Sequence, residues 1–130
     1  MSYAITVRLP AAFAPTLERV RGALQQQGFG VLTEIDVQAT LRQKVGVQME
    51  DYVILGACSP PLAHRAVEAD RDIGLLLPCN VVVRAEAPDV TVVQALDPQV
   101  MAQLSDRAGI EAVADEAAGR LRAALSALAG

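Results

Sequence analysis

The sequence predicts one α+β domain, because strand-like and helix-like hydrophobic patterns alternate along its first half, a hairpin follows, and a long amphipathic helix closes the chain. We place the domain at residues 1–130, a length that leaves little room for a second core. A hydrophobic composition of 52% supplies enough apolar material to fill one interior. The chain is therefore expected to fold as a single unit.

The first half is predicted to run strand, helix, strand, helix. Apolar residues alternate over residues 3–9, the period of a half-buried strand, and then recur at helical spacing over residues 13–24. Residues 30–35 form the next expected strand. Asp36 can then cap a short helix over residues 37–45, and each of the two helices is followed by a glycine that can end it.

The middle of the chain is predicted to hold the interior of the sheet. Residues 52–58 are apolar on both faces, as an interior strand would be. Ser59 then suits the N-cap of a helix over residues 60–69, with proline at its first position. Residues 79–86 and 90–96 are expected to pair as a hairpin.

The last part is predicted to be helical. Asp97 followed by Pro98 repeats the signal of a cap before a proline. Residues 110–128 then carry a long apolar stripe opposite charged residues, so this helix should cover one face of the sheet.

Charge and aromatic content limit the partners of the chain. The formal net charge is −4, and ten of the eleven basic residues are scattered arginines, so no basic stripe is available for phosphates. With no Trp, two Phe and two Tyr, platforms for stacking bases are scarce. No signal-peptide pattern opens the chain, and its longest uncharged apolar run, residues 73–83, is far shorter than the roughly 20 residues of a membrane helix. We expect a cytoplasmic protein with no nucleic-acid partner and no membrane contact.

Cys58 is the strongest single candidate for chemistry. It lies next to Ser59, the predicted N-cap of the following helix. At this end of a helix the dipole favours a thiolate and lowers the thiol pKa. Its strand neighbours Ile54 and Leu55 predict the opposite, an apolar packing site in which burial raises the pKa. Both interpretations stay open.

Cys79 and Asn80 form a second candidate at the start of the hairpin. The parity of the strand places Cys79 on its more apolar face, and Asn80 on the other face could recognise a polar group or simply belong to a turn. Cys58 and Cys79 both lie at strand junctions, where ligand clefts form. They lack the C-x-x-C spacing of a redox or zinc site, so packing roles are the alternative.

His64 and the carboxylates give weaker signals. The only histidine, His64, could act as a base or a third metal ligand, or form an exposed pair with Glu68. Two cysteines and one histidine leave a zinc site one ligand short, although Cu(I) accepts fewer soft ligands, so no metal or cofactor is assigned. Glu34 and Asp36 share one side of a strand and could form an acid–base pair, unless Asp36 is only a cap.

Three segments resemble one known family: GFGVLTEID (28–36), ILGACSPPLA (54–63) and GLLLPCNVVV (74–83). They are similar to the family catalogued as domain of unknown function 302, in order and over nearly the whole chain. The resemblance implies an α+β fold like half of the TATA-binding protein, with a curved, mostly antiparallel sheet of about five strands covered by helices. It implies a bacterial or archaeal origin and no established activity. The family motif usually reads Cys-Asn-Pro, and Ser59 replaces the asparagine here.

Two functional hypotheses follow. The first is a site for a small ligand, a soft metal or thiol-redox chemistry bordered by Cys58 and Cys79, with Ser59, Asn80 and His64 around it. The second is a non-catalytic homodimeric interaction module in which both cysteines are structural, because a sheet covered by helices on one face needs cover on the other. No reaction class follows from the residues, so an enzymatic role stays open.

Overall fold

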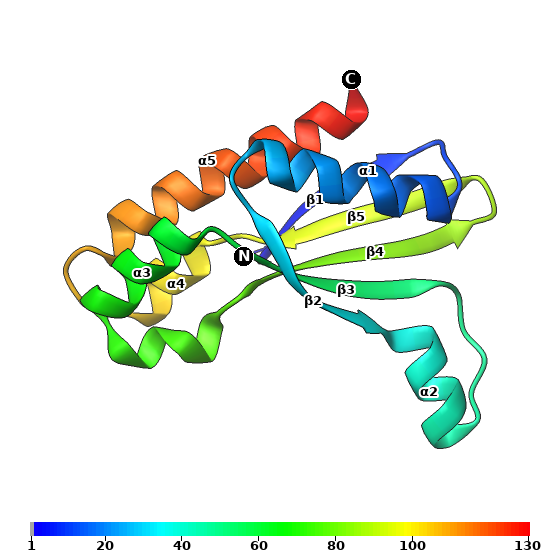
Figure 1. Ribbon diagram of the computed structural model, residues 1–130, viewed down its shortest axis with the longest axis horizontal. Helices are drawn as coiled ribbons and strands as arrows, with labels where there is room; N and C mark the ends of the chain where they lie inside the picture. The colour runs from blue at the N-terminus through cyan, green and yellow to red at the C-terminus, as the bar shows by residue number, and fades with distance from the viewer. Residues whose placement is uncertain (1) are drawn as a thin grey trace.

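The structure, a computed structural model, describes residues 2–130, and Met1 of the predicted domain lies outside them. Its elements confirm the predicted α+β class (Figure 1). In chain order they are β1 (Ala4–Leu9), α1 (Phe13–Gln26), β2 (Gly30–Asp36), α2 (Val37–Val45), β3 (Tyr52–Cys58), α3 (Pro60–Ala69), the 3₁₀ helix η1 (Arg71–Leu76), β4 (Cys79–Ala87), β5 (Val90–Leu96), α4 (Gln99–Leu104) and α5 (Ile110–Ala129).

The five strands form one open sheet in the order β1-β5-β4-β3-β2, and every neighbouring pair is antiparallel. This confirms the expected antiparallel sheet of about five strands. The hairpin of β4 and β5 forms as predicted, and β3 lies inside the sheet, as its two apolar faces indicate. A bulge between Val31 and Thr33 shifts the register of the edge strand β2.

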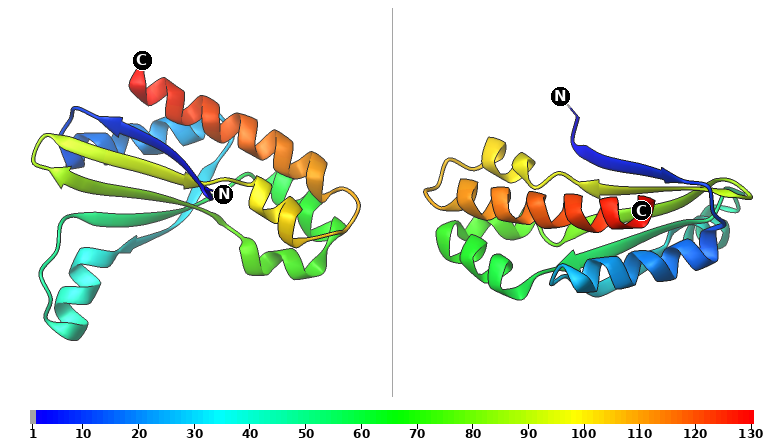
Figure 2. Two further views of the ribbon diagram at one scale, coloured as in Figure 1. Left: turned by 180° about the vertical axis from the view of Figure 1, so that it is seen from behind. Right: turned by 90° about the horizontal axis from the view of Figure 1, so that it is seen from above.

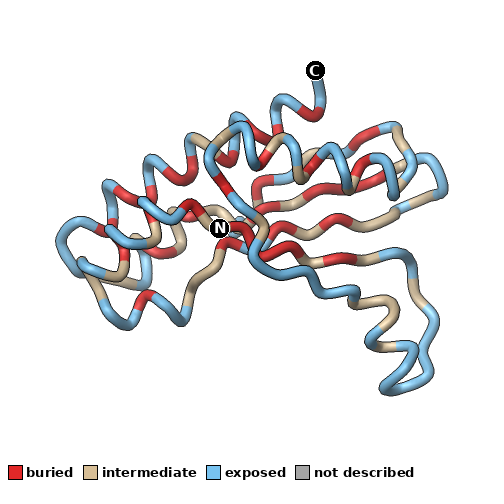
Figure 3. The backbone as a smooth tube through the Cα atoms, in the orientation of Figure 1, coloured by how far each residue is buried: buried red, intermediate tan, exposed pale blue. Residues whose placement is uncertain are grey.

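Helices α1 and α5 cover one face of the sheet (Figures 1 and 2). Side chains of alternating parity on the strands pack against them and form the larger hydrophobic core, seen as the buried stretches in Figure 3. Val20 and Leu24 of α1, Leu55 of β3, Val83 of β4 and Leu121 of α5 are almost completely buried in it. Helix α2 projects on the opposite side, and all nine of its described residues are exposed or only half-buried.

A second hydrophobic core lies beyond one end of the sheet. It joins α3, η1, α4 and the first half of α5, with Leu62, Ile73, Met101, Ile110 and Val113 buried in it. The sequence pattern did not predict η1, because six residues are too few to show a helical period.

Helix α5 belongs to both cores. The apolar stripe predicted over residues 110–128 is its buried face, and the first half packs in the second core while the second half packs on the sheet. Among residues 2–130, no helix combines the length and the apolar character that crossing a membrane requires.

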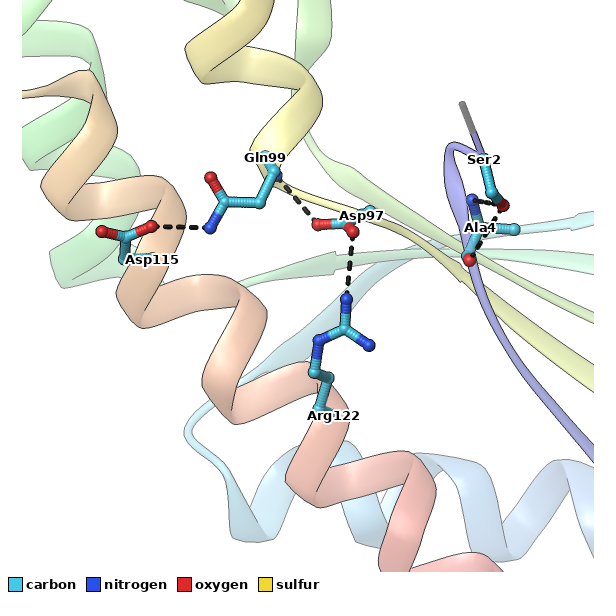
Figure 4. Close-up of polar contacts among 6 residues, drawn as sticks. All are labelled: Ser2, Ala4, Asp97, Gln99, Asp115 and Arg122. Carbon is cyan, nitrogen blue, oxygen red and sulfur yellow. Dashed lines mark hydrogen bonds and ion pairs between the residues drawn. The ribbon is translucent and has the colours of Figure 1, made fainter.

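A polar network fixes α4 against α5 (Figure 4). Asp97 accepts a hydrogen bond from the backbone N–H of Gln99 at 3.0 Å, and its other oxygen lies 3.1 Å from a guanidinium nitrogen of Arg122. The N-cap of α4 is Pro98, one residue after the predicted position. The side-chain amide of Gln99 donates to Asp115 at 2.6 Å. These bonds hold the helix that carries Met101 in place.

Candidate functional site at the junction of the two cores

The structure brings Cys58 and Cys79 to one cavity. Cys58 ends β3 and Cys79 begins the neighbouring strand β4, where Cys79 is the cross-strand partner of Ala57. Cys58 is half-buried and Cys79 is buried, and both are free thiols. The junction positions expected from the sequence therefore meet in space.

This cavity lies where the two hydrophobic cores meet and has a volume of about 30 Å³. Its walls come from the ends of β3 and β4 and from α3, α4 and α5. They include Cys58, Ser59, Leu62, Cys79, Met101 and Ala117. A single water needs roughly 10–15 Å³ of such space, so the cavity has room for one ion or a very small molecule. Apolar side chains form most of its surface.

Burial governs the ionisation of both thiols. Burial raises the pKa of the Cys58 thiol above its ordinary value, the direction expected for the apolar packing site that the sequence offered as one alternative. The pKa of Cys79 is raised to about 11, mainly by burial and further by the proximity of Cys58. At neutral pH both groups are therefore neutral thiols.

Ser59 occupies the N-cap position of α3, as predicted, but its hydroxyl does not cap the helix. The side chain is buried, with 3% of the residue exposed, and Ser59 Oγ has no hydrogen-bond partner among the described residues. A capping oxygen normally accepts a hydrogen bond from the second or third helical N–H, and the second position here is Pro61, which has none. Ser59, whose hydroxyl is thus left without a partner, is one of the residues that line the cavity beside the two cysteines.

His64 and Asn80, the other two predicted site residues, lie elsewhere. The His64 side chain is 75% exposed on α3 and lies 3.6 Å from Glu68, in the exposed pair that was the simpler interpretation. Asn80 is exposed on the opposite side of β4 from Cys79, where it lines a separate groove with Tyr52. Neither lines the cavity of the two cysteines.

The carboxylates of β2 have other partners. Asp36 accepts a hydrogen bond from the backbone N–H of Ala39 at 2.9 Å and so caps α2, while Glu34 forms an ion pair with Arg21 of α1. These contacts engage each carboxylate separately and explain both residues without acid–base chemistry.

The sequence did not single out Met101, the third sulfur-containing side chain in the cavity. It is 3% exposed on α4 and reaches the cysteines only because α4 packs on α5. The motif of Asp97 and Pro98 predicted its helix, but no local pattern could place that helix next to β3 and β4. Within residues 2–130, no three His, Cys, Asp or Glu side chains are grouped so that they could hold a metal ion.

Comparison with known proteins identifies relatives by sequence and by structure. The model of the family described as "Domain of unknown function DUF302" matches residues 5–128. A crystal structure of an uncharacterised conserved DUF302 protein from Bacillus stearothermophilus is similar to this chain with a TM-score of 0.88 and 28% sequence identity, covering 97% of this chain and 98% of that one. No match was found among curated proteins.

Proposed function

This chain belongs to the DUF302 family, and from the geometry of this member we propose that the domain binds a small ligand in the cavity lined by Cys58, Ser59 and Cys79. One observation carries the proposal: Ser59 lines an apolar cavity, and its buried hydroxyl has no hydrogen-bond partner among the described residues. Leaving a buried polar group unsatisfied costs about 1–3 kcal/mol, and a bound ligand that contacts the hydroxyl would recover part of that cost.

The same geometry favours binding over thiol-redox chemistry. The thiolate is the reactive form of cysteine, and burial raises the pKa of both Cys58 and Cys79. A buried neutral thiol is a weak nucleophile but can still contact a ligand or lose its proton to a metal. Asn80 and His64 lie outside the cavity, so the proposed contacts are limited to residues that line it.

Thermal unfolding with and without small ligands tests this proposal. The probes are soft metal ions and small neutral molecules of a few atoms, added to the full chain. A ligand at 100 times its dissociation constant stabilises the folded state by about 2.7 kcal/mol, which raises the unfolding midpoint measurably. Native mass spectrometry of the gently purified protein would show any ligand that remains bound.

A matched pair of variants locates the effect. Ala117→Val fills the cavity from α5, and Ala127→Val makes the same change at an exposed position of the same helix. We expect the ligand-induced shift to disappear in Ala117→Val and to persist in Ala127→Val. If no probe shifts the midpoint of the wild-type chain and no mass copurifies, the small-ligand proposal is wrong.

We also propose, as a second candidate, that the chain is a homodimeric interaction module. The observation that favours it lies on the sheet face opposite α1 and α5 (Figure 2). A shallow groove of about 540 Å³ there is lined by Tyr3, Tyr52, Val82 and Leu96 together with polar residues. Exposed apolar side chains lie nearby on β2 and after α2, including Ile35, which is 49% exposed. Apolar surface of this kind marks interfaces in other proteins, and a second copy could cover it symmetrically.

Light scattering coupled to gel filtration tests the dimer. We expect twice the mass of the chain at micromolar concentration, and a monomer would contradict the idea. Val82→Lys places a charge in the middle of the open sheet face and should dissociate the dimer. Gln25→Lys adds the same charge on the exposed side of α1 and should not.

A further inference from the structure

Three sulfur-containing side chains from three different elements line the cavity. Cys58 comes from β3, Cys79 from β4 and Met101 from α4, and Ser59 lines the cavity with them. Cys79 and Met101 are buried, and Cys58 is half-buried. Three residues with soft sulfur donors therefore line one small space, which a single cysteine could not provide.

The size of the cavity decides which ligands fit. Its volume of about 30 Å³ accepts an ion or a molecule of one or two heavy atoms and excludes a nucleotide, a sugar or an amino acid. Water is a poor occupant, because it needs two to four polar partners and the wall supplies one hydroxyl and two weakly polar thiols. A single ion that prefers sulfur suits both the volume and the wall.

The donor types select among ions. Mg²⁺ and Ca²⁺ take oxygen ligands, of which the wall offers only Ser59. Zn²⁺ in structural sites takes four nitrogen or sulfur ligands, and His64 is too far out on the exposed side of α3 to add one. Thiolate and thioether ligands together select Cu(I), which accepts low coordination numbers.

From this juxtaposition we infer that the cavity is a site for a soft monovalent metal ion, Cu(I), held by Cys58, Cys79 and Met101. The inference rests on the proposed ligand-binding function and names the ligand class of that same site. It adds Met101, which lies 22 residues beyond Cys79 along the chain, as a metal ligand.

Cu(I) binding exchanges two protons for one ion. Cu⁺ displaces the protons of the Cys58 and Cys79 thiols, because a thiol that coordinates a metal is deprotonated. Each copper–sulfur bond forms as a sulfur–hydrogen bond breaks, and both protons leave to solvent. Met101 as a thioether donates a lone pair without losing a proton. No oxidation state changes, so no further reactant is needed.

Two protons are therefore released for each ion bound, and affinity should rise with pH. The two cysteines are the titratable residues of the cavity wall, as far as the described residues show.

Competition for Cu(I) tests the inference on the full chain. Cu(I) is added without oxygen in the presence of a colorimetric Cu(I) chelator, and Ag(I) serves as an air-stable probe of the same softness. We expect one ion per chain, two protons released per ion in calorimetry with two buffers, and sulfur neighbours in the X-ray absorption spectrum of the copper.

Matched methionine variants separate a ligand from a packing residue. Met101→Leu keeps the apolar volume but removes the thioether, and Met49→Leu makes the same change in the segment between α2 and β3. Mutating a residue that only hydrogen-bonds to a metal ligand costs roughly 10–100-fold in metal affinity. Removing a ligand should cost at least as much, so Met101→Leu should weaken Cu(I) binding by that factor or more. The X-ray absorption spectrum should then show one sulfur neighbour fewer. Met49→Leu should bind as the wild type does.

Two results would overturn the inference: complete removal of Cu(I) from the wild type by the chelator, or unchanged binding in Met101→Leu. If a small neutral ligand nevertheless stabilises the wild type but not Ala117→Val, the proposed ligand-binding function is supported and only the assignment of Cu(I) as the ligand is wrong. If neither ions nor neutral ligands bind, both are wrong.

Discussion

The side chain of Thr33 on β2 lies over Gly56, its cross-strand partner on β3. A Cβ placed on Gly56 would overlap Thr33 Oγ1 and lie 3.0 Å from Pro78 Cγ, so the close approach of these strands depends on glycine. We expect Gly56→Ala to lower the free energy of unfolding by about 1–3 kcal/mol, the usual cost of overpacking a well-packed site. Urea denaturation of the purified variant measures this change.

Gly22→Ala is the matched control. A Cβ at Gly22, inside α1, meets nothing within 4 Å among residues 2–130. Alanine has the higher helix propensity, so this variant should gain up to about 1 kcal/mol. Opposite signs for the same substitution are the expected result. A neutral Gly56→Ala would mean that Thr33 rotates away at no cost.

Local signals predicted the strands and helix ends well, because each depends on neighbours in sequence. The cap at Asp36, the interior position of β3 and the buried stripe of α5 all follow from spacing within one element. The family was also predicted correctly from three segments, and the family model and the related crystal structure confirm it. The closer likeness to half of the TATA-binding protein and the lack of a nucleic-acid partner stay predictions.

The sequence predicted only part of the candidate site, because the site depends on contacts between distant parts of the chain. Parity and junction positions pointed to Cys58 and Cys79, but whether they share a wall depends on strand register and on how α4 packs against α5. Met101 joins them through contacts between distant parts of the chain. The orphaned hydroxyl of Ser59 had a local signal, the two prolines that follow it, because Pro61 removes one of the two N–H groups that a capping serine would bind.

Ser105 controls the ionisation of Asp70. The Ser105 hydroxyl donates to the Asp70 carboxylate at 2.6 Å, and this bond, with the backbone N–H of Asp72 and the charge of Arg107, outweighs burial and holds the pKa of Asp70 below its ordinary value. A lowered pKa adds stability that is present above the ordinary value of 3.8 and is lost as pH falls through the lowered one.

Ser105→Ala should therefore raise the pKa of Asp70 and reduce the loss of stability in acid. Carbon-13 NMR titration of the side-chain carboxyl measures that pKa directly. Ser126→Ala, an exposed change on α5, should leave it where it is. An unchanged Asp70 titration in Ser105→Ala would show that the hydroxyl has no influence.

Burial of Cys79 predicts a loss of stability in alkali. Its pKa rises from 9.0 to about 11 on folding, so the unfolded chain loses the thiol proton first as pH increases. This contribution is fully present below pH 9.0 and is lost as pH rises to about 11, with a total of roughly 3 kcal/mol at 1.36 kcal/mol per pKa unit.

Cys79→Val should flatten the fall in stability over this pH range, because it removes the titrating group and keeps an apolar side chain. The measurement is the urea midpoint of wild type and variant at several pH values, compared as differences so that other titrating groups cancel. Parallel curves for the two proteins would refute a raised pKa at Cys79.

Asp97 anchors α4, and two substitutions separate its roles. It accepts the N–H of Gln99 and pairs with Arg122, and its side chain is 16% exposed whereas that of Arg122 is 59% exposed. Asp97→Ala removes both contacts and should cost about 1–2 kcal/mol, mostly from the lost hydrogen bond to the first N–H of α4. Asp97→Asn keeps an acceptor for the N–H and loses only the exposed ion pair, so it should cost under about 1 kcal/mol. Chemical denaturation in low and high salt distinguishes the two terms, since salt screens the pairing with Arg122 but not the capping bond. Equal losses of unfolding free energy in both variants would mean that the ion pair with Arg122, rather than the hydrogen bond to the Gln99 N–H, anchors α4. The same ion pair would then be what places Met101 in the cavity.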